Sequence, residues 1–186
     1  MTIAAGYRDG KGTIGLICDS AVTTSFSFRS DNAKMFESGG LVWAIAGIMP
    51  PVFRQKRYPG TVAGVHSLAR DLYEACLKKN HGAVTEEGVF TIPVYAIVIG
   101  KGIGPFMIDA TGSVLEPTEG YIAVGSGSDV AMGAMHMAKS LDADTETALG
   151  AAFGAAVDLD PFCGGPGCLR LLSPVEARKT RKRTAT

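Results

Sequence analysis

The second residue of the chain, Thr2, can become a nucleophile at the N-terminus. Methionine aminopeptidases generally remove an initiator methionine that precedes a small residue, and Met1 precedes threonine here. The mature chain would then carry a hydroxyl and a free α-amine on one residue. Such a pair can act as nucleophile and general base, because an α-amine has an ordinary pKa of about 7.7 to 8.0. Many proteins begin with Met-Thr, so this interpretation needs companion residues.

A glycine-rich turn at 125–127 lies between an apolar segment and a helical pattern. A dinucleotide-binding turn requires a third glycine where this chain has Val130, and no phosphate-binding G-x-x-x-x-G-K-[ST] segment is present. Nucleotide binding therefore explains this turn poorly. The simplest interpretation is that the glycines let the chain reverse tightly into a helix, with Ser126 as a candidate N-cap of that helix.

Five short motifs accompany Thr2 in a fixed order: DSAVT at 19–23, NAKMF at 32–36, WAIAG at 43–47, AVGSGSDVAMG at 123–133 and DPFCGG at 160–165. This order resembles the proteasome β-subunit family, and the closer likeness is to bacterial HslV-type peptidases and small proteasome homologues, which are N-terminal-nucleophile hydrolases. The resemblance extends over nearly the whole chain. It implies a threonine-type endopeptidase with an α+β fold, a four-layer αββα sandwich in which two antiparallel sheets lie between helix layers.

Three positions match the family's nucleophile and the acid–lysine pair beside it: Thr2, Asp19 and Lys34. A lysine ammonium near the threonine favours the deprotonated forms of its hydroxyl and amine, and the aspartate keeps the lysine charged and oriented. The alternative for Asp19 and Lys34 is an ordinary surface ion pair, which contributes little. The order of the motifs favours the catalytic interpretation.

Gly47 matches the glycine whose backbone N–H stabilises the tetrahedral intermediate in this family. Ser126 and Asp160 match polar residues that lie near the threonine amine and complete its proton network. The chain departs from the pattern at Cys163, where the family commonly has Ser or Thr. A thiol is a weaker hydrogen-bond donor than a hydroxyl. The hydrogen bonds around the threonine amine are therefore expected to be weaker here than in the family.

The resemblance also implies residues that bind substrate. Ile45 and Met49, two positions on either side of Gly47, would form an apolar pocket for the side chain that precedes the cleaved bond. Thr23 would align the peptide backbone by strand-like hydrogen bonds. The prolines that follow Gly47 prevent the long regular helix that related chains have at this point.

No cofactor is required for the implied chemistry. The family often holds a structural cation on backbone carbonyls near the matching aspartate, and here these carbonyls belong to Val157, Asp160 and Cys163. Carbonyl oxygens suit hard cations such as sodium, magnesium or calcium.

The elements that must position these residues can be read from hydrophobic periodicity and turn signals. They include an initial hairpin around Asp9-Gly10, and the helix that begins near residue 144 has Asp142 or Asp144 as its candidate N-cap. The order indicates an α+β domain rather than alternating βαβ units. Strands are expected at 2–8, 13–18, 41–47, 92–100, 104–110, 113–116, 121–125 and 168–175, and helices at 60–80, 128–141 and 144–159.

The composition limits the remaining function classes. The 186 residues suit one domain, at 1–177, with a basic tail at 178–186. The net charge is zero, so the chain has no overall excess of positive charge that would favour binding to nucleic-acid phosphates. No segment predicts a membrane span or a secretory signal, and the four cysteines form no C-x-x-C pair, so a cytoplasmic protein with reduced thiols is expected.

The resemblance further implies a homo-oligomeric double ring that encloses its active sites, peptides or unfolded proteins as substrates, and an ATP-dependent unfoldase as a candidate partner. Two alternatives stay open. One is a catalytically silent ring that acts as a scaffold. The other is a stand-alone amidase that acts on a small acylated molecule.

Overall fold

A four-stranded antiparallel sheet carries the N-terminus of the chain. The structure is a computed structural model that describes residues 2–23, 27–29, 34–47 and 56–174. The strand order in this sheet is β12-β1-β2-β13, and β1 pairs with β2 as the predicted hairpin. The bounds are β1 (Ile3–Arg8), β2 (Ile14–Cys18), β12 (Tyr121–Gly125) and β13 (Cys168–Leu172).

A five-stranded antiparallel sheet has the order β11-β10-β9-β6-β5. Its strands are β5 (Met35–Ser38), β6 (Leu41–Gly47), β9 (Val94–Gly100), β10 (Ile103–Ile108) and β11 (Val114–Leu115). Two small hairpins complete the described strands, β3 (Ala21–Thr23) with β4 (Ser27–Arg29) and β7 (Ala83–Val84) with β8 (Phe90–Thr91).

The described residues form three helices outside the sheets: α1 (Val62–Lys78), α2 (Ser128–Ser140) and α3 (Thr145–Leu159). Thr61 caps α1 by accepting a hydrogen bond from the backbone N–H of Gly64 at 3.2 Å. Asp144 caps α3 in the same way, with the N–H of Thr147 at 2.8 Å. Of the two aspartates considered for this cap, Asp144 is therefore the one used.

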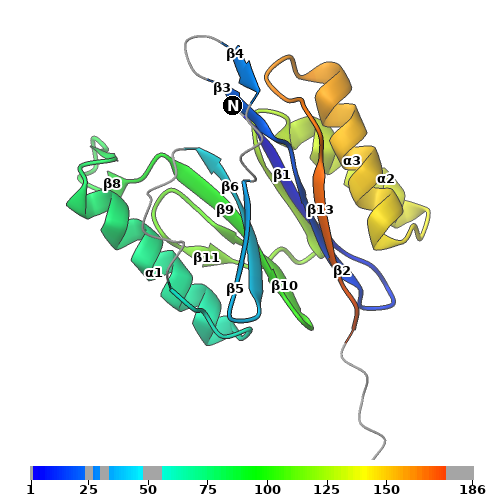
Figure 1. Cartoon of the computed structure of the whole chain (residues 1–186), viewed down its shortest axis with the longest axis horizontal. Coiled ribbons are helices and arrows are strands. Elements are labelled where there is room, and N and C mark those ends of the chain that lie inside the picture. The colour runs from blue at the N-terminus through cyan, green and yellow to red at the C-terminus, as the bar shows by residue number, and fades with distance from the viewer. Residues whose placement is uncertain (1, 24–26, 30–33, 48–55, 175–186) are drawn as a thin grey trace, which may run out of the picture.

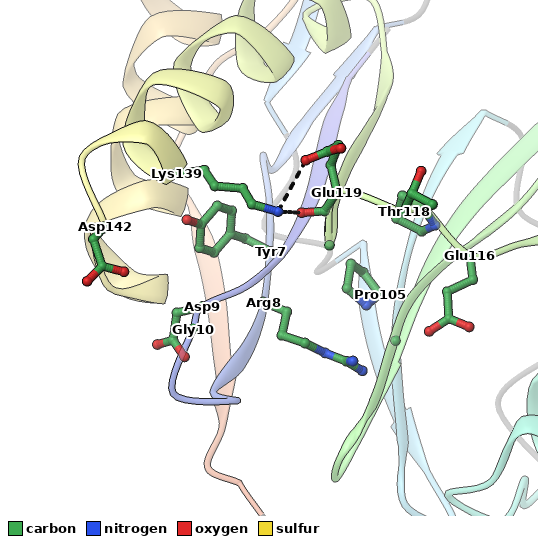
Figure 2. Close-up of a pocket in the computed structure, with 13 residues that line it drawn as sticks. Tyr7, Arg8, Asp9, Gly10, Pro105, Glu116, Thr118, Glu119, Lys139 and Asp142 are labelled. Carbon is green, nitrogen blue, oxygen red and sulfur yellow. Dashed lines mark hydrogen bonds and ion pairs between the residues drawn. The ribbon is translucent and has the colours of Figure 1, made fainter.

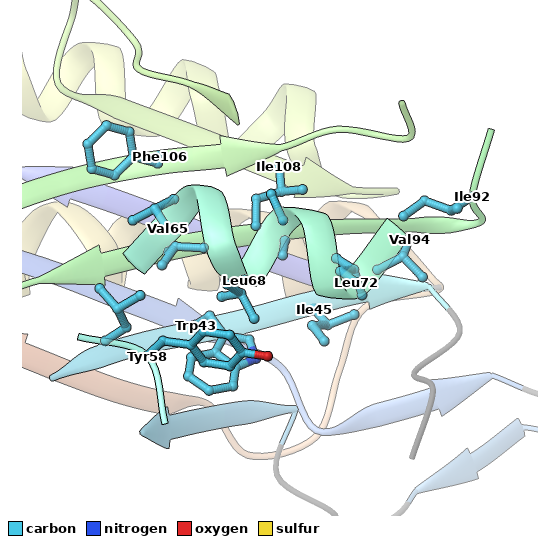
Figure 3. Close-up of a cluster of buried hydrophobic side chains, with 14 of the residues drawn as sticks. Trp43, Ile45, Tyr58, Val65, Leu68, Leu72, Ile92, Val94, Phe106 and Ile108 are labelled. Carbon is cyan, nitrogen blue, oxygen red and sulfur yellow. The ribbon is translucent and has the colours of Figure 1, made fainter. Parts of the chain in front are cut away.

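Three clusters of buried side chains hold these elements together. One lies between α1 and the five-stranded sheet and includes Trp43 and Leu72 (Figure 3). A second joins α2 and α3 to the four-stranded sheet, and the third joins residues of the two sheets to each other. Figure 1 accordingly shows α1 on one side of the strands and α2 with α3 on the other. The predicted α+β class is confirmed.

Strand β6 is buried on both faces, as its continuous apolar sequence predicts. Trp43 and Ile45 belong to the cluster under α1, whereas Ala44 and Ala46 belong to the cluster between the sheets. Alternate residues of a strand point to opposite faces, so the two clusters share this strand. The strand ends at Gly47, and this end contributes to the candidate site described below.

Most of the predicted elements agree with the structure within two or three residues, but the short strands β3, β4, β5, β7 and β8 were not predicted. They have two to four residues each, which is too short for a periodic pattern. The predicted basic tail at 178–186 lies outside the described residues. Among the described helices, none has the length and apolar character needed to cross a bilayer.

Candidate active site

The backbone brings three polar residues together at one end of the four-stranded sheet. Thr2 immediately precedes β1, and Asp19 immediately follows β2, its partner in the hairpin. The N–H of Asp19 donates to the carbonyl of Ile3 at 3.1 Å, and the N–H of Ile3 donates to Oδ1 of Asp19 at 3.3 Å. Lys34 reaches this point from the five-stranded sheet, where its carbonyl accepts the N–H of Ile45 at 3.3 Å.

The side chains of Thr2, Asp19 and Lys34 form one hydrogen-bonded group. Nζ of Lys34 donates to Oδ1 of Asp19 at 2.8 Å and also to Oγ1 of Thr2, while the threonine hydroxyl donates to the same carboxylate oxygen. Asp19 is fully buried, Thr2 is 4% exposed and the lysine side chain is 14% exposed. The alternative of an ordinary surface ion pair is therefore wrong. Whether the group is catalytic stays a prediction.

Gly164 is a further contact of this group that the sequence did not indicate. Its backbone N–H donates to Oδ2 of Asp19 at 3.3 Å. The preceding turn is held by Asp160, whose carbonyl accepts the N–H of Cys163 at 3.0 Å and whose Oδ1 accepts the N–H of Phe162 at 2.9 Å. The glycine stands in the DPFCGG motif, which was the available signal, but a backbone donor has no side chain to mark it.

Asp160, Cys163 and Ser126 form a second polar group. The Cys163 thiol donates to Oδ2 of Asp160 at 3.3 Å, and its sulfur lies 3.8 Å from the Ser126 hydroxyl. Burial, reinforced by the neighbouring Asp160, raises the pKa of Cys163 to about 11. Burial also tends to raise the pKa of Asp160, but hydrogen bonds from Ser126, the Phe162 N–H and the Cys163 thiol lower it overall. At neutral pH the thiol is therefore the donor and the carboxylate the acceptor.

Replacing Cys163 with alanine is expected to lower the free energy of unfolding by about 1 kcal/mol at pH 7, because the carboxylate loses a donor. The lowered pKa of Asp160 makes its carboxylate stabilising above the pKa that it has in the unfolded chain, and this contribution is lost as the pH falls through the lower folded value. The difference between wild type and variant should therefore shrink toward acid pH in urea titrations. Cys76→Ala, which removes a thiol from the cluster under α1, should lower the free energy of unfolding equally from pH 7 to acid pH, because burial raises the pKa of this thiol and it stays protonated over that range. A Cys163→Ala loss that is equally independent of pH would contradict the prediction.

The two glycines that flank Ser126 each allow a close approach. A Cβ atom on Gly125, which has a φ of 106°, would lie 1.9 Å from the carbonyl oxygen of Thr2. A Cβ atom on Gly127 would lie 2.8 Å from the sulfur of Cys163. Gly127 is the N-cap of α2, and no side chain caps that end. The alternative that Ser126 caps the helix is therefore wrong, and the turn brings the backbones of β12 and Thr2 together.

Gly125→Ala is expected to reduce both stability and any reaction at Thr2. The new methyl group cannot be accommodated without moving the Thr2 carbonyl, and a positive φ strains alanine. The free energy of unfolding is therefore expected to fall by about 1–3 kcal/mol. The matched control is Gly133→Ala within α2, where a Cβ would meet no atom within 4 Å. The free energy of unfolding of this control should rise by about 0.5–1 kcal/mol. Thermal unfolding of both variants would test the contrast, and equal melting temperatures would contradict it.

Gly47 ends β6 beside Thr2, and the two residues line a common cavity. Its φ is 118°, and a Cβ atom would lie 2.1 Å from the carbonyl oxygen of Pro93. The family resemblance assigned this glycine the role of an oxyanion donor. The carbonyl of Pro93, immediately before β9, gives a separate reason for glycine at this position that does not depend on a substrate. The role of Gly47 as an oxyanion donor stays a prediction.

The structure describes two of the three predicted substrate-binding residues, Thr23 and Ile45. Ile45 is 4% exposed and lies in the cluster under α1 (Figure 3). Its neighbour Ala46 lines the cavity beside Thr2, so Ile45 lies on the opposite face of β6. Thr23 ends β3, whose backbone pairs with β4. Met49 lies outside the described residues. The apolar pocket assigned to Ile45 and Met49 stays a prediction.

The backbone fits the implied structural cation in part. The Val157 carbonyl has no helical donor four residues later, because Pro161 has no N–H. The Asp160 carbonyl already accepts the N–H of Cys163 and keeps one lone pair. In the described part of the chain, no group of three or more His, Cys, Asp or Glu side chains could hold a metal ion. The cation stays a prediction, and no step of the proposed reaction uses it.

A second cavity, of about 560 Å³, lies at the opposite end of β1 (Figure 2). Lys139 spans part of it through an ion pair of 3.3 Å with Glu119, and Arg8 points into it. Within the described residues, Nε of Arg8 is buried without a hydrogen-bond partner. None of the predicted site residues lines this cavity, so it is separate from the candidate active site.

Comparison with known proteins identifies the fold. The BPH protein of Thiobacillus denitrificans matches with a TM-score of 0.78 and 18% identity, over 95% of this chain and 100% of that chain. Its complex with epoxomicin matches with a TM-score of 0.75 and 19% identity, over 94% and 100%. Eukaryotic HslV from Trypanosoma brucei matches with a TM-score of 0.65 and 21% identity, over 92% and 99%.

This chain has the fold of BPH and HslV. The sequence matches no protein-family model. The predicted likeness to proteasome-like proteins is therefore supported at the level of the fold. At 18–21% identity, the assignment to one subtype and the activity are matters of proposal.

Proposed function

We propose that this chain is a threonine-type endopeptidase that uses Thr2 as its N-terminal nucleophile after removal of Met1. The buried contact of the Thr2 hydroxyl with both Lys34 and Asp19 carries this proposal. The order of the three core clusters supports the finer assignment to the four-layer αββα arrangement of N-terminal-nucleophile hydrolases.

The proposed reaction begins when Oγ1 of Thr2 attacks the scissile carbonyl and the α-amine of the same residue accepts the hydroxyl proton. The ammonium of Lys34 favours this transfer, and Asp19 keeps the ammonium in place. The N–H of Gly47 stabilises the oxyanion of the tetrahedral intermediate. Collapse of the intermediate breaks the C–N bond, and the α-ammonium returns its proton to the leaving amine.

The resulting acyl-enzyme is an ester of Thr2. A water molecule attacks this ester while the α-amine accepts one of its protons, and the second collapse releases the acid product and restores the hydroxyl. Ser126 and Asp160 would orient the amine through the second polar group. The pKa directions of that group support this role, because they leave a carboxylate acceptor at neutral pH.

The proposal extends to assembly. Subunits would close into a homo-oligomeric double ring in the cytoplasm, with peptides or unfolded proteins as substrates and an ATP-dependent unfoldase as a candidate partner. The shared fold with HslV supports the ring. A silent ring scaffold and a stand-alone amidase are the alternatives, and the complete polar group at Thr2 weighs against the silent scaffold.

Labelling with epoxomicin, a peptidyl epoxyketone, tests the proposal directly, because epoxyketones react with both the hydroxyl and the amine of an N-terminal threonine. BPH has been solved with this compound. The expected result is an intact mass that lacks Met1 and gains one adduct per chain. Retention of Met1 on every chain would overturn the proposal. Failure to label despite loss of Met1 would favour the scaffold, and sedimentation would distinguish a ring from a stand-alone amidase.

A further inference from the structure

A cavity of about 610 Å³ lies beside the proposed nucleophile and is not the pocket that the resemblance assigned to substrate. Thr2 and Gly47 both line it, so a carbonyl placed between the nucleophile and the oxyanion donor would sit at its edge. The remaining walls come from the ends of β6, β9, β10 and β12 and the first turn of α2. They are formed by Ala46, Pro93, Tyr95, Met107, Ala123, Val124, Gly125, Ser126 and Ser128.

The cavity opens on the face of β6 opposite to Ile45. Ala46 belongs to the cluster between the sheets, and Met107 packs against the same cluster. Tyr95 pairs with Ala46 across the two strands and lies two residues from Ile97 of that cluster, so it has the same orientation. Ile45 faces α1 instead. A substrate at Thr2 would therefore find two different surfaces on the two sides of β6.

At the attacked carbonyl carbon, the chain that precedes the cleaved bond and the leaving amine point in different directions. If the residue before the cleaved bond lies on the α1 side of β6, the leaving amine and the residue that carries it lie on the side of the cavity. The positions of Ser126 and Ser128 agree with this assignment, because hydroxyl groups lie where a departing amine needs hydrogen-bond partners.

The walls also indicate what the cavity binds. Among the described residues that form these walls, no side chain is charged, and the polar side chains are hydroxyl groups. Burying a charged side chain against such walls would be costly, because the described wall side chains supply no partner ion to offset the loss of hydration. Tyr95 is 42% exposed, so it presents an aromatic surface to an incoming group. The volume is within the range of about 300–1,000 Å³ typical of ligand pockets.

We propose that this cavity binds an apolar side chain of the substrate residue that follows the cleaved bond, with Tyr95 and Met107 as the residues that determine specificity. This inference rests on the proposed function and adds a preference on the leaving-group side. It makes the enzyme selective on both sides of the cleaved bond, since the predicted pocket for the preceding residue is also apolar.

The test uses the purified full chain and peptides of one sequence that differ only in the residue after the cleaved bond, either Leu, Asp or Lys. The wild type is expected to cleave before Leu with a kcat/KM at least about tenfold above that before Asp or Lys, as one well-filled apolar pocket allows. Tyr95→Glu should reverse the order of Leu and Lys, because it places a carboxylate at the cavity wall. A merely structural effect of this variant would lower all three rates together.

Val84→Glu is the matched control, since Val84 is 66% exposed on β7 and does not line the cavity. It should leave the wild-type order unchanged. Equal cleavage of the three wild-type peptides, or a Tyr95→Glu variant that keeps the wild-type order, would overturn the inference while the proposed function stands. An absence of hydrolysis for every peptide, including fluorogenic amides, would overturn the proposed function and the inference with it.

Discussion

Thr2→Ala is expected to lower kcat/KM for peptide hydrolysis by about a thousandfold or more, because the variant has an amine but no nucleophilic oxygen. Epoxyketone labelling should disappear in the same variant. The Thr2 hydroxyl contacts Lys34 and Asp19, so its removal also leaves these two groups with one partner fewer. Fluorogenic peptide hydrolysis and intact-mass spectrometry would measure both effects on one preparation.

Thr2→Ser is the control for this experiment, since it keeps a hydroxyl and removes only a methyl group. It should retain measurable hydrolysis and form the epoxyketone adduct. The Thr2→Ala protein should still fold, because the ion pair of Lys34 with Asp19 does not depend on the hydroxyl. Full activity in a folded Thr2→Ala protein would place the reaction elsewhere in the molecule.

Lys34→Met is expected to lower the free energy of unfolding by about 3–5 kcal/mol and to abolish hydrolysis. Asp19 is fully buried, so removal of its partner at 2.8 Å leaves an uncompensated buried charge. Among the described residues, the Thr2 hydroxyl and the backbone N–H groups of Ile3 and Gly164 remain as donors to this carboxylate, and both N–H contacts are 3.3 Å long. Urea denaturation at pH 7 would measure the loss of stability.

Two further variants distinguish this effect from the loss of any lysine. Lys56→Met removes an ion pair of similar length, 2.7 Å to Asp71, whose lysine side chain is 60% exposed. Lys56→Met should lower the free energy of unfolding by no more than about 1 kcal/mol. The double variant Asp19→Asn with Lys34→Met should recover part of the stability without recovering hydrolysis. If Lys34→Met and Lys56→Met lowered the free energy of unfolding equally, burial of Asp19 would not make the loss of its lysine partner more costly, and the prediction would be wrong.

Local patterns in the sequence predicted the principal elements of the fold. The Asp9-Gly10 turn predicted the first hairpin, and the 3.6-residue periodicity of 60–80 predicted α1. The continuous apolar run at 41–47 predicted a strand buried on both faces. These signals succeed because turn chemistry and amphipathic spacing act over a few neighbouring residues. The order of five motifs also indicated Thr2, Asp19 and Lys34, which the structure brings into contact.

The tertiary structure decided what depends on residues that are distant in the chain. The contact of the Gly164 N–H with Asp19 spans 145 positions, and β13, which follows α3 in the chain, lies beside β2, a strand near the start of the chain. The cavity beside Thr2 combines the ends of four strands that have separate places in the sequence. Only packing showed that Gly47 and Gly125 are required by neighbouring carbonyls. Residue types and their spacing thus determined which groups could react, whereas the pairing and packing of distant strands decided which of them meet and what surface surrounds them.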